Sequence, residues 1–203
     1  MTFVSNVFTV LKNPTTATYE TLKAKVLSNT FEWYFYGETV SLREKDKGLP
    51  HCPDCQDDDA MFLSHTVVNR PNINTSYIPQ MSSIHLEETE KVVREICEFN
   101  DIDLKCIYRM NFNLIINQGQ DALARTPFHR DHEFNHKILL VYLTGFTGGA
   151  TVADVDGEEN VSEPEENGII SFDGKYYHAA RFPNLNHERR IVLNCTYEDR
   201  SFY

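Results

Sequence analysis

The chain has 203 residues, 41% of them hydrophobic and 12% aromatic, which is enough to bury a core without disulfides or metals as staples. Its 19 basic and 30 acidic side chains give a net charge of −11, and this acidity argues against binding to duplex nucleic acid. No run of about 18 or more apolar residues occurs, so we expect no membrane-spanning segment.

The first half of the chain predicts two helices and one strand. A Thr-rich cap opens a helix over Thr16–Ser28, and FEWYFYG, Phe31–Gly37, alternates large apolar residues as a strand does. Residues from Glu38 to Met81 look irregular, and we expect a long loop there that covers the substrate site. The clearest helix runs from Ile84 to Asp101, with acidic residues in its first turns. Its apolar face is predicted to comprise Ile84, Val92, Val93, Ile96 and Phe99.

After residue 105 the hydrophobic period changes to that of strands. CIYRMNFNLIIN, Cys106–Asn117, alternates, with Asn111 and Asn113 on one side and Phe112 and Leu114 on the other. Further short β-type runs follow, punctuated by Gly and Asn: Ile138–Leu143, Gly149–Val155, Gly168–Phe172 and Arg189–Tyr197. Helices followed by many short strands predict a sandwich or barrel with the helices packed outside.

The N-terminal stretch and the cysteines indicate the cellular compartment in which the protein is expected. MTFVSNVFTVLKNPTT has no basic region, no continuous apolar region and no small-residue cleavage site, so it does not read as a secretory signal. The five cysteines are an odd number and mostly far apart, which agrees with a reducing compartment. We therefore expect a cytoplasmic protein. HCPDC, residues 51–55, is half of a zinc site; a turn with two free thiols is the favoured interpretation, and a metal contact completed by His65, His85 or a second subunit is the alternative.

FHRDHEFNH, residues 128–136, contains two competing metal motifs. HExxH, formed by His132, Glu133 and His136, is the zinc signature of a metallopeptidase, with the Glu as general base. That chemistry needs a long helix, whereas Pro127 precedes the motif and the β-branched, Gly-rich run ILLVYLTGFTGG follows it. The zinc peptidase is therefore the less favoured hypothesis.

The other motif is HxD, formed by His129 and Asp131. Because the two residues are two positions apart on an extended chain, their side chains point to the same side and can bind one metal ion. A 2-His-1-carboxylate site needs a second histidine, and His178, in a strand-like region, is the candidate. Arg190 follows it at the start of an alternating strand, where a buried arginine would grip a carboxylate.

The ordered set of motifs around these residues resembles a known family. RMNFNLIIN precedes HRD, VYLTGFTGGAT follows it, VSEPEENGIISFDGKYYH leads to the distal histidine, and HERRIVLNCTY closes the pattern. The segment from Cys106 to Tyr197 thereby resembles the Fe(II)/2-oxoglutarate-dependent oxygenases, especially the prolyl-4-hydroxylase-like branch, which includes phage-encoded members. The resemblance implies a mainly β fold with N-terminal helices and a double-stranded β-helix (a cupin-like jelly roll). It also implies one domain over residues 1–203, in which 106–203 form the catalytic core.

The resemblance assigns roles residue by residue. It implies His129, Asp131 and His178 as iron ligands and Arg190 as the partner of the distal carboxylate of 2-oxoglutarate, with Arg189 left open as the alternative. Further expected contacts are Tyr142, Asn194 and Asn113 to the cosubstrate, and Asn111 and His136 to the substrate.

The implied activity is hydroxylation of a peptide, protein or small molecule, coupled to oxidative decarboxylation of 2-oxoglutarate to succinate and CO2. The cofactors implied are Fe(II), 2-oxoglutarate and O2, with ascorbate as an accessory reductant. For a phage-encoded member the location implied is the cytoplasm of the host. A catalytically silent jelly-roll binding module is the alternative that the intact motif residues speak against.

Overall fold

The computed structural model describes residues 7–36, 61–71, 80–81, 83–119 and 124–199. Within these residues the chain forms two helices and eleven strands. In chain order they are β1 (Thr9–Leu11), α1 (Ala17–Val26), β2 (Tyr34–Tyr36), β3 (Phe62–Asn69), β4 (Gln80–Met81), α2 (Leu86–Phe99), β5 (Leu104–Ile116), β6 (Lys137–Tyr142), β7 (Thr151–Val155), β8 (Glu158–Ser162), β9 (Ile169–Asp173), β10 (Tyr177–Ala180) and β11 (Arg189–Asp199).

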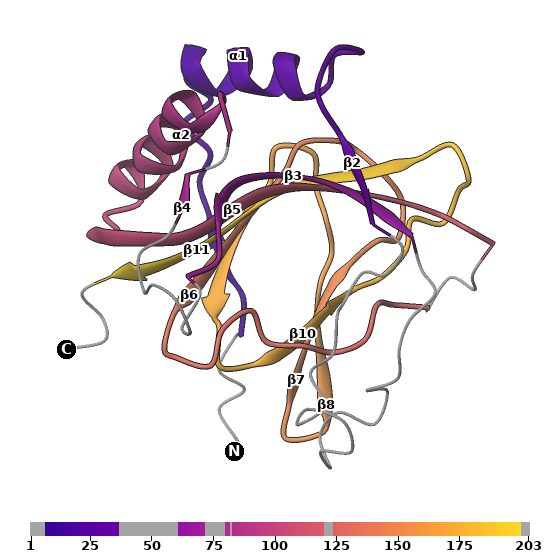
Figure 1. The fold of residues 1–203 in the computed structure, drawn as a ribbon. Helices are drawn as coiled ribbons and strands as arrows, with labels where there is room; N and C mark the ends of the chain where they lie inside the picture. Colours follow the sequence, from indigo (N-terminus) through magenta and orange to yellow (C-terminus); the bar gives the residue numbers. More distant parts are fainter. Residues whose placement is uncertain (1–6, 37–60, 72–79, 82, 120–123, 200–203) are drawn as a thin grey trace.

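The strands form two antiparallel sheets. The larger sheet has the order β1-β9-β6-β11-β5-β3-β2, with β4 paired to β3, and the smaller sheet has the order β10-β7-β8. Figure 1 shows the smaller sheet below the larger one, and the helices α1 and α2 on the opposite face of the larger sheet. This arrangement confirms the predicted mainly β class with N-terminal helices, and the two sheets are those of a jelly roll.

Strand alternation gives the larger sheet two different faces. On β5 and β11 one set of alternate side chains, including Met110, Phe112 and Leu193, joins the core under the helices. The other set, including Arg190 and Asn194, faces the space between the two sheets. A second apolar cluster lies between the sheets, where Ala153 of β7 meets residues of β6, β9 and β11. The helical layer therefore stabilises one face and leaves the other for a site.

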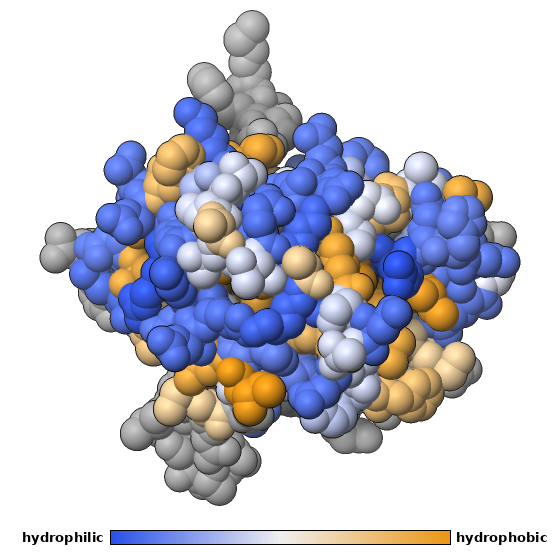
Figure 2. Space-filling model, turned by 90° about the horizontal axis from the view of Figure 1, so that it is seen from above, coloured by the Kyte–Doolittle hydropathy of each residue, from blue (hydrophilic) through white to orange (hydrophobic). Residues whose placement is uncertain are grey.

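The two helices have the predicted positions, but the apolar face of α2 differs from the prediction. Thr16 caps α1, since its side chain accepts a hydrogen bond from the Tyr19 amide (3.2 Å). In α2 the buried residues are Thr89, Val92, Val93, Ile96 and Cys97. Ile84 precedes the helix and is 85% exposed, and Phe99 is 56% exposed at its last turn, so neither belongs to the buried face. The view from above, the side on which the helices lie, is mainly hydrophilic, with small scattered apolar patches (Figure 2).

The expectation of an irregular segment from Glu38 to Met81 was wrong for Phe62–Asn69. These residues form β3, which pairs with β5 inside the larger sheet. The polar residues Ser64 and His65 made this segment look like a loop in the sequence. Both are in fact buried and hydrogen-bonded: Ser64 donates to the Phe112 carbonyl, and His65 contacts the Ser83 hydroxyl. The prediction was also wrong for Gln80–Met81, which form β4, and the short strands β1 and β8 were not predicted. HCPDC lies outside the described residues, and so does most of the predicted covering loop.

In the part of the chain that the structure describes, no helix has the length and apolar character needed to cross a bilayer.

Candidate active site

The backbone brings the HxD segment against strand β10. The His129 amide donates to the His178 carbonyl (3.0 Å), and the His178 amide donates to the His129 carbonyl (2.9 Å). Arg125 and Arg181 pair in the same antiparallel way, so residues 125–129 extend the smaller sheet beyond β10. His178 also pairs with Ala153, whose side chain lies in the cluster between the sheets, and it points into that space. The two histidines are therefore neighbours because their strands are hydrogen-bonded.

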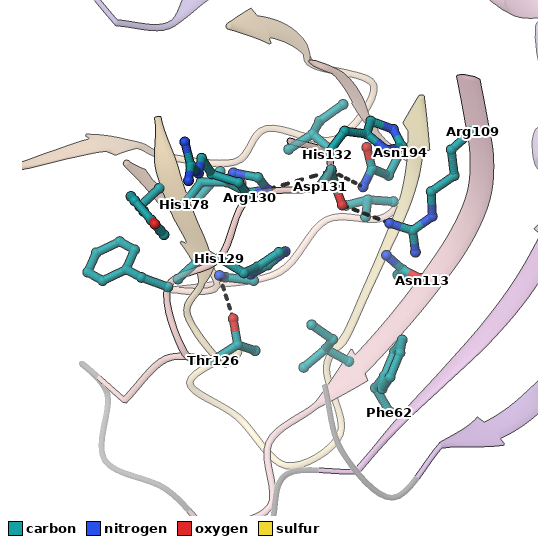
Figure 3. Close-up of a pocket in the computed structure, with 18 of the residues that line it drawn as sticks. Phe62, Arg109, Asn113, Thr126, His129, Arg130, Asp131, His132, His178 and Asn194 are labelled. Carbon is teal, nitrogen blue, oxygen red and sulfur yellow. Dashed lines mark hydrogen bonds and ion pairs between the residues drawn. The ribbon is translucent and has the colours of Figure 1, made fainter. Parts of the chain in front are cut away.

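His129, Asp131 and His178 converge at one point. Their potential ligand atoms all lie within 4.8 Å of one another, and His178 Nε2 is 3.7 Å from Asp131 Oδ2. Among the described residues these three are the one group of side chains placed to hold a metal ion. Figure 3 shows all three side chains around the same pocket.

Backbone carbonyls select the tautomer of both histidines. His129 Nδ1 lies 3.2 Å from the Pro127 carbonyl, and His178 Nδ1 lies 3.2 Å from the Tyr176 carbonyl. Because a carbonyl oxygen only accepts, each Nδ1 must carry the proton, which leaves the Nε2 lone pair for a metal ion. This arrangement of a ring nitrogen on a backbone carbonyl is usual for histidines that bind metals.

The two oxygens of Asp131 have different partners. Oδ1 accepts hydrogen bonds from Arg109 (2.8 Å) and from Arg70 (3.0 Å), whereas Oδ2 faces His178 and the Asn194 amide (3.5 Å). The Asp131 side chain is completely buried. Oδ2 is therefore the oxygen available to a metal ion, and Oδ1 fixes the orientation of the carboxylate.

Burial and charge keep all three groups in the protonation state that binds a metal. Burial alone would raise the pKa of Asp131, but Arg109 and Arg70 outweigh it and hold that pKa well below its usual range. Burial lowers the pKa of His129, and it lowers the pKa of His178 to about 3. The site at neutral pH thus consists of one carboxylate and two neutral imidazoles, a donor set that suits Fe(II).

The HExxH residues do not form a zinc site. Residues 130–136 form no helix, so His132 and His136 are not stacked one turn apart as a metallopeptidase requires. His132 Nε2 lies 2.7 Å from the Thr196 hydroxyl, and His136 Nδ1 donates to the Phe134 carbonyl (2.8 Å). The choice of HxD over HExxH agrees with this geometry.

Arg190 is buried between the sheets, and Arg189 is exposed, as strand alternation requires. Arg190 donates from Nε to the Gly149 carbonyl (2.9 Å) and from one terminal nitrogen to the Thr151 hydroxyl (2.9 Å). Tyr142 shares the same Thr151 hydroxyl (2.7 Å) and does not itself line the cavity. Arg190 has no carboxylate partner among the described residues, although burial of an unpaired charge is costly. It is therefore prepared for an anionic ligand.

The other predicted contact residues are placed unequally. Asn113 and Asn194 line the cavity, and the Asn194 carbonyl oxygen is buried without a partner in the described structure. Asn111 is fully buried and donates to Asn113 (2.5 Å), so it holds the Asn113 side chain without lining the cavity itself. His136 is fully buried against Gly174 and does not line the cavity, so the structure does not bring it to a substrate.

The metal-binding group, Arg190, Asn113 and Asn194 line one cavity of about 330 Å³. Four arginines line it, two beside Asp131 (Arg70 and Arg109), one at the surface (Arg130) and one in the interior (Arg190). Of the residues that the structure describes, Asp131 and Glu133 are the acidic ones that line it. The cavity is therefore cationic inside a strongly acidic chain.

Solved structures share this fold. An oxidoreductase of the 2OG-Fe(II) oxygenase family from Burkholderia pseudomallei is 15% identical, with 95% of this chain and 85% of that chain covered and a TM-score of 0.62. A prolyl hydroxylase from Trichoplax adhaerens is 9% identical over 96% and 84% of the two chains (TM-score 0.54). The α-ketoglutarate-dependent epimerase SnoN is 11% identical over 96% and 78% (TM-score 0.57). The chain has the fold of the 2-oxoglutarate- and iron-dependent oxygenases. No family model and no curated protein matches its sequence.

Three residues around this oxygenase fold's cavity were missed in the sequence. Arg109 shares a strand face with Asn111 and Asn113, so the alternation that marked the two asparagines also pointed to it. Arg70 directly follows β3, in a segment that was expected to be irregular. Thr151, which joins Tyr142 to Arg190, lies in a strand that was predicted without a functional residue.

The burial of His132 predicts an acid-sensitive fold. Burial lowers the pKa of His132 from 6.5 to about 3, so its imidazole is neutral in the folded protein. In the unfolded protein the same imidazole takes up a proton below about pH 6.5. Stability should therefore fall as the pH drops from 6.5 towards 3, and at pH 5 this residue alone should account for about 2 kcal/mol. Urea unfolding of the metal-free protein at pH 7.5 and pH 5 measures the difference, which His132→Asn should reduce. His187→Asn, at an exposed position, is the control and should leave the pH dependence unchanged; an equal effect of both substitutions would contradict the prediction.

Proposed function

We propose that the protein is a non-haem Fe(II)- and 2-oxoglutarate-dependent oxygenase that hydroxylates a carbon of its substrate. The observation that carries the proposal is the pairing of two sites in one cavity. His129, Asp131 and His178 can form a metal-binding group, and the same cavity contains the buried Arg190, which has no carboxylate partner among the described residues. The shared fold and the motif order support the same function.

Each part of the chain has a defined task in this proposal. When bound, iron and 2-oxoglutarate supply the oxidation, in which O2 and 2-oxoglutarate give succinate, CO2 and the hydroxylated substrate. Arg190 binds the distal carboxylate of 2-oxoglutarate, and Thr151 and the Gly149 carbonyl hold its guanidinium in position. Tyr142 orients Thr151 through its hydroxyl. Arg109 and Arg70 orient Asp131 so that one carboxylate oxygen faces the two histidines.

The substrate, the location and the accessory factor are finer parts of the proposal. A peptidyl proline is the nearest analogue, because the motifs resemble the prolyl-4-hydroxylase-like branch and a prolyl hydroxylase shares the fold. A small molecule is the second candidate, because SnoN, which has the same fold, has been solved with nogalamycin RO. We further propose that residues 1–203 act as one domain, that the protein works in the cytoplasm, and that ascorbate keeps the iron reduced.

Slow turnover of 2-oxoglutarate without a prime substrate tests the proposal. The protein is incubated with Fe(II), 2-oxoglutarate, ascorbate and O2, and succinate is measured, with a chelator-treated sample as control. Succinate that depends on added iron is the expected result. Binding of 2-oxoglutarate with no succinate would instead favour the silent binding module. Hydrolysis of a peptide substrate that is lost in His136→Ala but kept in His178→Ala would instead revive the zinc peptidase.

A further inference from the structure

The side of the cavity beside Asp131 carries more positive charge than the proposed reaction uses. Arg190 matches the distal carboxylate of 2-oxoglutarate, and Asp131 together with the keto-acid carboxylate matches the two charges of Fe(II). Arg70, Arg109 and Arg130 then face Glu133 alone among the charged residues that line the cavity. Among the described lining residues a net charge of +2 therefore remains, in a chain whose total charge is −11.

Arg109 and Arg190 are separate anchor points. On the larger sheet Arg190 pairs with Ile115, whereas Arg109 pairs with Thr196. The two positions are six residues apart along the paired strands, which corresponds to about 20 Å between their Cα atoms. A cosubstrate held by Arg190 is not held by Arg109, which donates to Asp131 instead.

The two arginines beside Asp131 retain unused hydrogen-bond donors. Each guanidinium carries five N–H groups, and Arg70 and Arg109 each use one terminal nitrogen to donate a hydrogen bond to Asp131 Oδ1. Their other N–H groups have no hydrogen-bond partner in the described residues. The Arg70 side chain is 43% exposed and the Arg109 side chain 18%, so this pair joins the buried metal site to the open side of the cavity. Guanidinium groups arranged in this way bind carboxylates and phosphates with two parallel hydrogen bonds.

We propose that the prime substrate presents a carboxylate or phosphate group to Arg70 and Arg109 beside Asp131. The inference names the substrate class of the proposed oxygenase and rests on that function. Tyr36 and Phe62, whose rings stack 5.2 Å apart, line the same cavity and offer an apolar wall to the rest of the substrate. Arg130, exposed and placed over the Tyr177 ring (4.7 Å), adds a third positive charge to the cavity lining.

Matched pairs of blocked amino acids test the proposal by calorimetry. The first pair is acetyl-aspartate amide and acetyl-asparagine amide, and the second is acetyl-phosphoserine amide and acetyl-serine amide. Within each pair the compounds differ in charge and little else, and the two pairs separate a carboxylate from a phosphate. Each is titrated into the full-length protein saturated with Mn(II) and 2-oxoglutarate, and into the protein without either, so that Arg190 is occupied in one series and open in the other.

We expect the anionic member of at least one pair to bind about tenfold tighter than its neutral partner. Arg70→Gln should remove this preference, whereas Arg94→Gln, an exposed arginine on α2 that is also paired to a carboxylate, should keep it. Arg190→Gln should keep it as well. Equal affinities within both pairs, or a preference that is lost in Arg190→Gln but kept in Arg70→Gln, would overturn the proposal.

The outcomes separate this inference from the function on which it rests. Iron-dependent succinate formation without a preference for either anionic probe would refute the substrate class and keep the oxygenase. A preference that depends on Arg70 in a protein that forms no succinate would support the anion site and refute the oxygenase.

Discussion

Asp131→Asn is expected to abolish both metal binding and the formation of succinate. The substitution keeps the shape of the side chain but removes its charge. Because Arg109 and Arg70 can donate only to the amide oxygen, the N–H2 group of the asparagine would face the two histidines, where it offers no lone pair to a metal ion. Residues that only orient a metal ligand typically change metal affinity by about 10- to 100-fold, so loss of a ligand charge should exceed about 100-fold. Calorimetry with Mn(II) measures the affinity without turnover, and succinate formation with Fe(II) measures the reaction.

Asp173→Asn is the matched control for this experiment. Asp173 is also a carboxylate near positive charges, 3.7 Å from both Lys137 and Lys175, but it does not line the cavity. It should keep metal affinity and succinate formation. If Asp131→Asn bound Mn(II) within tenfold of the unchanged protein, the assignment of Asp131 as a ligand would be wrong.

Arg190→Gln should weaken 2-oxoglutarate binding and leave metal binding intact. Truncating one partner of a buried, hydrogen-bonded charge pair costs about 2 to 5 kcal/mol, which corresponds to a loss of at least thirtyfold in affinity. Gln retains a donor for Thr151 but cannot supply the two parallel N–H groups that a carboxylate needs. Titration of 2-oxoglutarate into the Mn(II)-loaded protein gives the affinity, and titration of Mn(II) gives the metal site.

Arg189→Gln tests the neighbouring residue, which the sequence left open as the alternative. Because the Arg189 side chain is exposed, the Arg189→Gln protein should bind 2-oxoglutarate as tightly as the unchanged protein. The reverse result, with Arg189→Gln weak and Arg190→Gln unchanged, would reassign the cosubstrate site.

Sequence reasoning succeeded where a local pattern corresponded to a local structure. The Thr-rich cap at Thr16 marked α1, and the alternation of β5 separated Asn113 from Phe112, which the structure places on the cavity side and in the core respectively. The approach of His178 to His129 has no local pattern, because it depends on the pairing of two segments distant in the chain. The family resemblance supplied that expectation, and the hydrogen-bonded pairing provides its physical cause.

The failures have physical reasons as well. β3 was missed because its polar side chains are satisfied inside the fold, so its composition resembles that of a loop. Arg70 and Arg109 were missed because their role depends on a carboxylate that lies far from them in sequence. Ile84 was assigned to the helix face because it fits the helical period, but the helix begins only after it.

The hydrogen-bonded pairing of His129 with His178 has a consequence for how the ion is captured. Two of the three proposed ligands, His129 and His178, lie on backbone segments that pair with each other, whereas Asp131 lies outside the strands and its carboxylate is held by Arg109 and Arg70. Most of the entropic cost of fixing these side chains is therefore incurred when the chain folds, and little of it when a metal ion binds. In the proposed oxygenase, small adjustments of the metal site would then fall to Asp131, because paired backbone holds the two imidazoles in place.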